Sequence, residues 1–567
     1  MDSDGFRDFL SESSRRDFLK RAGGAAGLAM LLGSGLEVLA ACGGGSQTQA
    51  PTAGHKGGHL IEVWHNDIAT FNTLNYSSTV DLINSGFTFD SLLTTQTGGE
   101  LVPLLARTMP KTSSDGRTYT FDLRRDVNWT DGQQLTSDDV AFTYNLLIDP
   151  QYSDFISPQR GEFSTYVQSV TNPDKFTVVF TLKGVYAPFL VNFMQWGVLP
   201  KHVLGSMSAK ELNTAAFFKG PTVTSGVFKF VKWDKGQQIT LARNDGYYRG
   251  PALVDTYVYK VVGNTQETAI SLKNSEADLG VADPAFFDQL KAASNLNTTT
   301  LDIPLMYYFG FQLDPSKPAS RLFSDKSVRQ ALLYALDRQK FITAVFFNLA
   351  KVTDAFEPKS SWAYDPKQVR FPFDRAKAEQ MLDAAGWKKG SDGIRVKEGV
   401  KMQFEVIVNN NNVRINMVNA MQQMWKDIGV AFQPKVVDGN DWIQRWRISR
   451  NFDMLLMATQ WGQDPDQSSI WASRNAAVGG SNAMGYKNTA LDGVLHDAVS
   501  LLDQNKRKDL YFKMQEILAE DLPAAPLVTS QYVWAYNKRV HNIKFGPFSQ
   551  WNQRPWFKDV WVEQTTG

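Results

Sequence analysis

The sequence predicts a mixed α/β protein of two or three domains. Its 567 residues are more than one hydrophobic core usually organises. Apolar residues make up 43% of the chain and charged residues 21%, as in water-soluble globular proteins. Strand-like alternation over Thr118–Leu123 and a helical apolar stripe over Val328–Leu336 indicate that strands and helices are both present.

The amino-terminal 42 residues predict an exported lipoprotein. Cys42 is the only cysteine, and it follows Leu39-Ala40-Ala41, which resembles the lipobox of bacterial lipoproteins. Ser14–Lys20 resembles the twin-arginine export motif. We therefore expect a signal peptide over 1–41 and a lipid on Cys42 that anchors the protein at the outer face of the cytoplasmic membrane. The alternative is a membrane-spanning helix over 22–41, but its glycines and Glu37 disfavour a stable span.

Composition narrows the remaining choices. Residues 42–58 are rich in Gly, Ser, Gln and Thr and predict a flexible tether before the globular part. A formal net charge of +1 gives no electrostatic case for binding nucleic acid. The six histidines are scattered without a helical ligand spacing, so we predict neither a metal site nor a cofactor.

The first elements of the globular part are strands. Leu60–Trp64 is an apolar run that ends in a polar loop, and loops at strand ends are where ligand-binding groups usually gather. Thr118–Leu123 alternates apolar and polar residues, as a half-buried strand does. Ser137 is expected to cap the next helix. Large aromatics such as Trp129 are expected in the core.

Two later helices have clear signals. Val328, Ala331, Leu332, Ala335 and Leu336 form an apolar face at helical spacing, and Ser324 or Asp325 can cap that helix. A second helix begins near Ala378 and is expected to end at Gly386 as a left-handed stop.

Several motifs together resemble the family 5 extracellular solute-binding proteins, the receptors of oligopeptide, dipeptide and nickel ABC importers. The signature region is Tyr119–Arg124, Val127–Gly132 and Asp138–Phe142, and later similarities lie at Ser327–Arg338 and Asp521–Pro526. The resemblance runs from about residue 60 to 567.

The resemblance implies a type II periplasmic-binding-protein-like fold, in which two lobes joined by a hinge close around a solute. An extra α/β domain would accompany the lobes in a monomer. The implied boundaries are 58–90, 200–303 and 527–567 for lobe I, 91–199 for the extra domain, and 304–526 for lobe II.

The resemblance also suggests an anchor for a peptide amine. In peptide-binding relatives an aspartate a few residues after a tryptophan binds the peptide's amino terminus, and Trp461 and Asp464 match that spacing. Asp464 is also followed directly by Pro465, so it is alternatively a structural Asp-Pro aspartate. The choice bears on ligand class because a buried ammonium without a counter-charge is unfavourable.

Other candidate ligand residues lie near the ends of expected elements. Arg447 lies where some relatives place a basic residue facing the ligand carboxylate, although a solvated arginine is the alternative. Ser225-Gly226 can offer backbone groups to a ligand or form a simple turn. Trp64 with His65, and Trp446, flank the expected cleft; indole faces also stack on sugar rings, but tryptophans commonly fill cores.

These observations favour a non-enzymatic receptor that delivers an oligopeptide-like solute to the permease of an ABC importer. An oligosaccharide receptor is the nearest alternative, and a nickel or haem receptor is disfavoured by the sparse histidines. A secreted hydrolase is the alternative from another class. We find no Gly-x-Ser-x-Gly elbow, no His-Glu-x-x-His and no cysteine nucleophile.

Overall fold

The computed structural model describes residues 55–76, 86–546 and 557–563. They belong to one compact unit, His55–Gly567. The predicted signal peptide, Cys42 and most of the predicted tether lie outside the described residues. In the described part, no helix combines the length and the apolar character needed to cross a membrane.

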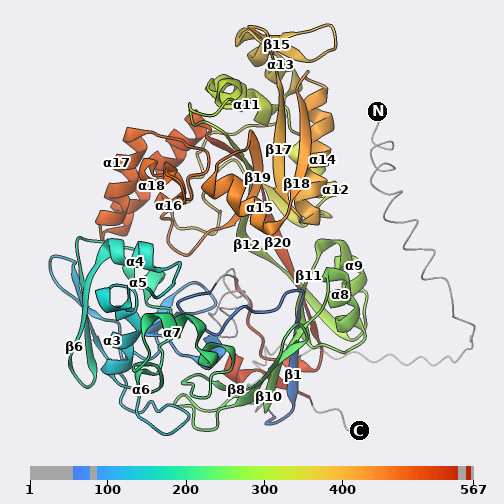
Figure 1. Cartoon of the computed structure of the whole chain (residues 1–567). Coiled ribbons are helices and arrows are strands. Elements are labelled where there is room, and N and C mark those ends of the chain that lie inside the picture. Colours follow the sequence, from blue (N-terminus) through green and yellow to red (C-terminus); the bar gives the residue numbers. More distant parts are fainter. Residues whose placement is uncertain (1–54, 77–85, 547–556, 564–567) are drawn as a thin grey trace, which may run out of the picture. The chain divides into compact units, whose positions relative to one another are not determined.

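One large sheet organises the described residues (Figure 1). Its strand order is β18-β17-β19-β12-β20-β11-β1-β10-β9-β8, and β13 also pairs with β20. The bounds are β18 Ala431–Val437, β17 Gln403–Asn409, β19 Met454–Gln460, β12 Leu296–Phe311, β20 Ala524–Asn537, β11 Leu279–Ala282, β1 His59–Trp64, β10 Thr256–Val261, β9 Gln238–Arg243, β8 Phe228–Asp234 and β13 Ala350–Val352.

Strands β12 and β20 connect the two halves of this sheet. They pair antiparallel from Leu296 opposite Asn537 to Gly310 opposite Ala524, with a register shift around Pro304. On one side β20 pairs with β11, and on the other β12 pairs with β19. The predicted lobe boundaries at 303/304 and 526/527 therefore fall inside these two strands.

The half that contains β1 has a parallel centre. Strand β1 pairs parallel with β10 and with β11. Helix α8 (Thr265–Lys273) connects β10 to β11, as a parallel crossover requires. The side chain of Asn264 caps α8 by accepting a hydrogen bond from the Glu267 backbone.

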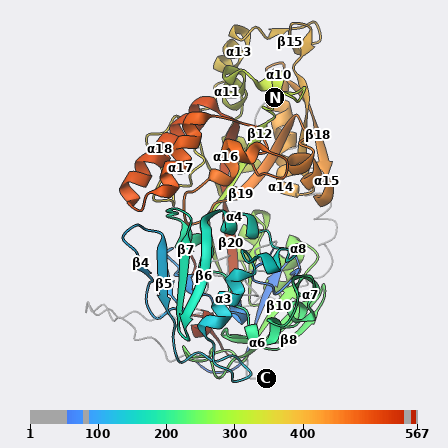
Figure 2. The ribbon, with the colours of Figure 1, turned by 60° about the vertical axis from the view of Figure 1, so that its left-hand side comes forward.

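A separate four-stranded antiparallel sheet lies within residues 111–182, in the order β4-β5-β7-β6 (Figure 2). The bounds are β4 Lys111–Thr112, β5 Thr118–Asp122, β7 Thr177–Leu182 and β6 Val167–Asp174. The predicted strand is confirmed as β5, with Tyr119 and Phe121 buried. Trp129 is also buried, as predicted. These side chains share one hydrophobic cluster with β8–β10.

The cap predicted for the next helix was wrong by one residue. Helix α3 spans Ser137–Asn145, and its N-cap is Thr136. The Asp139 carboxylate accepts a hydrogen bond from the Thr136 backbone N–H over 2.9 Å. The Ser137 hydroxyl instead donates to the Asp174 carbonyl over 2.6 Å, because it packs against the end of β6.

Both later helices follow their predicted signals. Helix α11 spans Lys326–Tyr334 with Asp325 as N-cap, and the five residues of the predicted apolar face are buried. Helix α13 spans Arg375–Ala384. Gly386 follows it at φ +86°, the left-handed conformation that favours glycine.

Shorter elements and the remaining helices complete the chain. The other helices are α4 Arg160–Tyr166, α5 Phe189–Phe193, α6 Lys201–Leu204, α7 Ala209–Thr214, α9 Phe287–Lys291, α10 Ser320–Phe323, α12 Arg338–Ala344, α14 Asn412–Lys426, α15 Gly439–Ile443, α16 Ser468–Trp471, α17 Thr489–Ser500 and α18 Gln504–Asp521. A π-helix covers Gln444–Ile448. The short strands are β2 Leu93–Thr95, β3 Leu101–Pro103, β14 Lys388–Lys389, β15 Arg395–Lys397, β16 Val400–Lys401, β21 Val540–His541 and β22 Trp561–Val562.

Candidate functional site

The carboxyl ends of parallel strands are the natural place to look for a ligand site in an α/β sheet. In one half, β1 and β11 are parallel and end at Trp64 and Ala282. In the other half, β17 is parallel to both β18 and β19. The last residues of these strands and the segments that follow them contain six of the eight predicted ligand residues: Trp64, His65, Trp446, Arg447, Trp461 and Asp464.

Trp64 and His65 lie where β1 ends. The Trp64 indole is buried, donates to Glu62 Oε1 over 2.8 Å, and packs edge-on against Trp534 at 6.4 Å between ring centroids. His65 is exposed, and the Asp283 carboxylate, just after β11, interacts with it electrostatically. Trp64 is thus held by the protein itself, whereas His65 reaches solvent.

Four buried donor groups lie near the carboxyl ends of β17, β18 and β19. One belongs to the last residue of β19, and the other three follow the strands. They have no hydrogen-bond partner in the described part of the chain. An unpaired buried donor is costly, and such groups are rare in folded proteins. Bound solutes and waters are the other groups that offer acceptors to such donors. The four atoms are Arg414 Nε, Trp446 Nε1, Gln460 Nε2 and Trp461 Nε1.

The backbone of Trp461 is held at the end of β19. Its backbone N–H donates to the Pro304 carbonyl over 2.9 Å, at the register shift of β12. Its ring packs in the hydrophobic cluster that also contains Trp442, and Trp446 packs against that cluster. The backbone bond and the packing hold Trp461 directly after β19.

Arg414 was missed by sequence reasoning. It lies in the first turn of α14, three residues after the N-cap Asn411. Its Nη1 donates to Asn409 Oδ1 over 2.5 Å, and no ion pair joins it to a carboxylate among the described residues. Burial lowers the pKa of Arg414, and the phenols of Tyr307 and Tyr308 oppose that shift.

A signal for Arg414 was present in the sequence. The first turn of a helix favours anions, because its free N–H groups carry partial positive charge. A cation at that place, directly after a buried strand, conflicts with the local rule. Such conflicts are expected at functional sites.

Asp464 is placed differently from an open amine anchor. Arg507 Nη2 donates to both of its oxygens, over 2.7 and 2.9 Å, and each side chain is 7% exposed. Burial raises the pKa of Asp464, and the Arg507 guanidinium opposes that shift. The Asp464 charge already has a partner, which fits the alternative of a structural Asp-Pro aspartate.

Arg447 and Ser225-Gly226 also make contacts within the protein. Arg447 is exposed in the π-helix, and its Nε donates to the Gly479 carbonyl over 2.7 Å. The backbone N–H groups of Ser225 and Gly226 both donate to the Thr88 carbonyl. These contacts fit the solvated-arginine and simple-turn alternatives.

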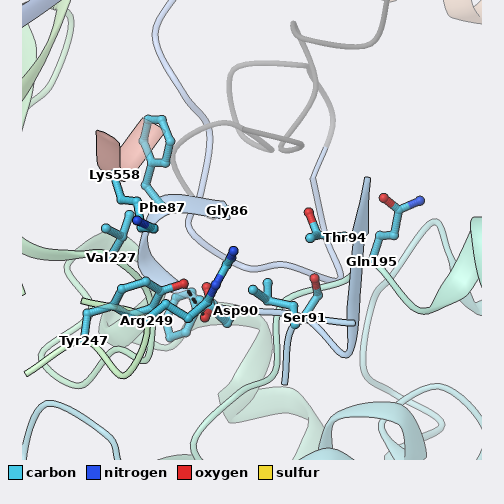
Figure 3. Close-up of a pocket in the computed structure, with 12 residues that line it drawn as sticks. Gly86, Phe87, Asp90, Ser91, Thr94, Gln195, Val227, Tyr247, Arg249 and Lys558 are labelled. Atoms are coloured by element: carbon cyan, nitrogen blue, oxygen red, sulfur yellow. Dashed lines mark hydrogen bonds between the residues drawn. The ribbon is translucent and has the colours of Figure 1, made fainter. Parts of the chain in front are cut away.

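A pocket away from the strand ends surrounds Asp90, which sequence reasoning also missed (Figure 3). The hydroxyls of Tyr247 and Tyr248 donate to Asp90 Oδ2 over 2.9 and 2.7 Å. Burial raises the pKa of Asp90 to about 6. Figure 3 shows Tyr247 and Arg249 beside Asp90, with Gln195 on the other side of the pocket. The carboxylate ties the segment 86–94 to the segment 244–249.

No group of three or more His, Cys, Asp or Glu side chains within the described ranges is arranged to hold a metal ion. The described part of the chain is therefore an α/β protein in which one large sheet carries unpaired buried donors after its parallel strands.

The chain belongs to the bacterial extracellular solute-binding proteins of family 5, since the model of that family's middle region matches residues 100–481. The oligopeptide-binding protein AppA of Bacillus subtilis is 30% identical over 526 residues, which cover 90% of this chain and 94% of that protein. Di/tripeptide-binding protein 1 of Pseudomonas aeruginosa is 27% identical over 504 residues, which cover 85% of this chain and 90% of that protein.

Solved structures agree with this assignment. B. subtilis AppA in complex with a nonapeptide matches with a TM-score of 0.79 and 27% identity, covering 90% of this chain and all of that one. NikZ of Campylobacter jejuni in complex with Ni(L-His) matches with a TM-score of 0.75 and 26% identity, covering 86% and 96%. The predicted fold class is thereby confirmed.

Proposed function

We propose that this chain captures an oligopeptide-like solute outside the cytoplasm and delivers it to the permease of an ABC importer. The family and its peptide-binding relatives support this class of function. The single observation that carries the site is the set of unpaired donors after β17, β18 and β19. A peptide has carbonyl and carboxylate oxygens to accept from all of them.

Arg414 is expected to make the strongest contact with the solute. A half-buried guanidinium without a carboxylate partner favours an anionic ligand group. A peptide's carboxyl terminus or an acidic side chain supplies that group, and the guanidinium fork can pair both oxygens. The buried Asp464–Arg507 pair, by contrast, stabilises the loop after Trp461, and the Asp464 charge is already paired with Arg507.

An oligosaccharide remains the second candidate because two of the unpaired donors are indoles. Trp446 and Trp461 offer a ring face and an N–H each, and sugars use both. A neutral glycan leaves Arg414 without an anion. That charge is our reason for ranking peptide first.

The remaining parts of the proposal concern organisation and location. Lobe I comprises 58–90, 200–303 and 527–567, lobe II comprises 304–526, and 91–199 is the extra domain. The lobes close about β12 and β20, which pass between them. A twin-arginine signal over 1–41 exports the protein, and a lipid on Cys42 holds the monomer at the outer face of the cytoplasmic membrane.

Native mass spectrometry of the gently purified mature protein tests the ligand class. We expect a family of peptide masses to be released when the protein unfolds. Hexose or pentose increments would assign the site to glycans instead. For an empty protein, titration with a random tetrapeptide mixture and with cello- and xylo-oligosaccharides gives the same decision. Mass analysis of the amino terminus tests the anchor: an unprocessed residue 1 in the membrane fraction contradicts it.

A further inference from the structure

Two segments far apart in the sequence meet along a seam, which we define as the contacts between 91–199 and 461–502. The side-chain amide of Gln463 donates to Thr95 Oγ1 over 2.8 Å. The backbone N–H of Ala187 donates to the Val499 carbonyl over 2.7 Å. The proposed function assigns these segments to the extra domain and to lobe II, so lobe movement strains or breaks the seam.

A tyrosine hydroxyl lies in the seam between two carboxylates. Tyr186 Oη is 3.1 Å from Glu162 Oε1 and 3.4 Å from Asp466 Oδ2. Asn192 Nδ2 donates to the same hydroxyl over 2.8 Å. The Tyr186 ring is fully buried and stacks on Tyr166 at 3.6 Å between centroids. The hydroxyl therefore cannot move away from either carboxylate without disturbing the stack.

The remaining atoms fix the carboxylates in place. Asp466 Oδ1 accepts hydrogen bonds from the backbone N–H and the hydroxyl of Ser468, over 2.9 and 2.6 Å. Glu162 is in α4, on the other segment. Each carboxylate is held from its own side, and Tyr186 is the group between them.

One phenolic proton cannot serve two carboxylates. A hydroxyl donates a single hydrogen bond, and Asn192 already donates to this oxygen. When both carboxylates are ionised, one faces the phenol oxygen without a proton between them, and the two charges repel. A second proton on either carboxylate removes the repulsion and supplies the missing donor.

Among the residues that the structure describes, no ion pair neutralises either carboxylate. Across the described chain, neither Glu162 nor Asp466 takes part in an ion pair, and Arg507 is committed to Asp464. The charged or titratable groups that interact with the trio are Tyr76, Tyr166, Asp464 and Tyr511. Those that interact with these neighbours are Arg474, beside Tyr166, and Glu357 and Arg507, beside Asp464.

We propose that Glu162, Tyr186 and Asp466 form a proton-dependent latch, which tightens the seam in mildly acidic solution and loosens it when both carboxylates are ionised. Burial, and next the Asp466 charge, raise the pKa of Glu162, which agrees with this assignment. A carboxyl whose pKa is raised by a contact stabilises that contact below the raised pKa and loses the contribution as pH rises through it. Since the latch rests on the proposed lobe closure, it also couples solute retention to external pH.

Hydrogen exchange at Ala187 tests the latch without any ligand, because that N–H bonds across the seam. The mature protein and its Glu162→Gln and Asp466→Asn variants are compared at the same pH, so intrinsic exchange rates cancel. At pH 8 we expect slower exchange over 183–190 in both variants than in wild type. At pH 5.5 the difference should shrink. Glu100→Gln, at an exposed carboxylate, should match wild type at both values.

Exchange in the variants that equals wild type at pH 8, or exceeds it, overturns the latch. Tyr186→Phe provides a second measure, since it removes the bridging hydroxyl while keeping the stack. It should speed exchange over 183–190 relative to wild type at pH 5.5, because the hydroxyl that hydrogen-bonds across the seam is gone. Unchanged exchange there also overturns the latch.

Peptide affinity separates the latch from the proposed function. Wild type should bind a released peptide several-fold more tightly at pH 5.5 than at pH 7.5, because burial raises the pKa of Glu162 and the closed seam retains the proton. Glu162→Gln should lose this dependence with the same peptide. A pH-dependent seam with no peptide or glycan bound supports the latch and contradicts the receptor function. Peptide binding together with a seam whose hydrogen exchange does not depend on pH supports the receptor function and contradicts the latch.

Discussion

Arg507, in helix α18, and Arg414, in helix α14, have opposite surroundings. Arg507 faces Asp464 with a short ion pair and contacts the Tyr511 hydroxyl. Arg414 has an amide oxygen and two phenols as neighbours, without a carboxylate. A charge that has its partner in the fold stabilises the fold, and a charge that lacks one is available to a ligand. We therefore expect Arg507 to act in folding and Arg414 to act in ligand binding.

The largest expected effect comes from breaking the paired arginine. Arg507→Gln leaves Asp464 buried without a counter-charge, which typically costs about 3–5 kcal/mol of stability. Urea denaturation monitored by tryptophan fluorescence measures it. The double variant Arg507→Met, Asp464→Leu removes both charges and should recover most of the loss. A single variant as stable as wild type would show that the pair does not stabilise the loop.

Asp90 extends the comparison to a carboxylate that has hydroxyl partners instead of a cation. Its folded-state pKa of about 6 lies above the ordinary value, so the folded state holds the proton more tightly. Stability should therefore fall as pH rises from about 4 to about 6, by about 3 kcal/mol from this group. Denaturation midpoints across that range measure the slope. Asp90→Asn should flatten it, and an identical slope in the variant would contradict the assignment.

The unpaired arginine should affect binding more than folding. Arg414→Gln should weaken binding of a captured peptide by about 2–3 kcal/mol, roughly 30- to 150-fold, the value of a charged hydrogen-bonded contact. Its melting temperature should stay level or rise, because a desolvated charge is removed. Isothermal titration calorimetry and thermal unfolding give both numbers. Arg447→Gln is the matched control at an exposed arginine and should change neither by more than about 0.5 kcal/mol.

The smallest effect isolates one unpaired donor. Trp461→Phe keeps an aromatic ring in the cluster but removes the indole N–H, so peptide binding should weaken by about 1 kcal/mol. Binding of a peptide and of a neutral glycan to this variant, measured by calorimetry, compares the two ligand classes. Unaltered affinity for every ligand would exclude the Trp461 N–H from the site.

Much of the fold was predictable from local pattern, and much of the site was not. The apolar face of α11, the stop at Gly386 and the alternation of β5 are local, so spacing alone predicts them. The partners of Asp464 and Asp90 lie 43 and 157 or more residues away, and no spacing rule reveals such pairs. Whether Asp464 binds a ligand depends on Arg507, which the sequence places in an unremarkable helix. The sequence did contain a signal for Arg414, because a cation in the first turn of a helix is unfavourable.

The pairing of β12 with β20 has a consequence for how such chains can be recombined. Gly310 and Ala524 stand opposite each other in the ladder, so the segment 311–523 leaves and re-enters the sheet at neighbouring positions. It behaves as a cassette inserted at a single point. Exchange of this cassette between relatives would require only two junctions on adjacent strands, so one half of the receptor could be replaced while the other half keeps its sequence.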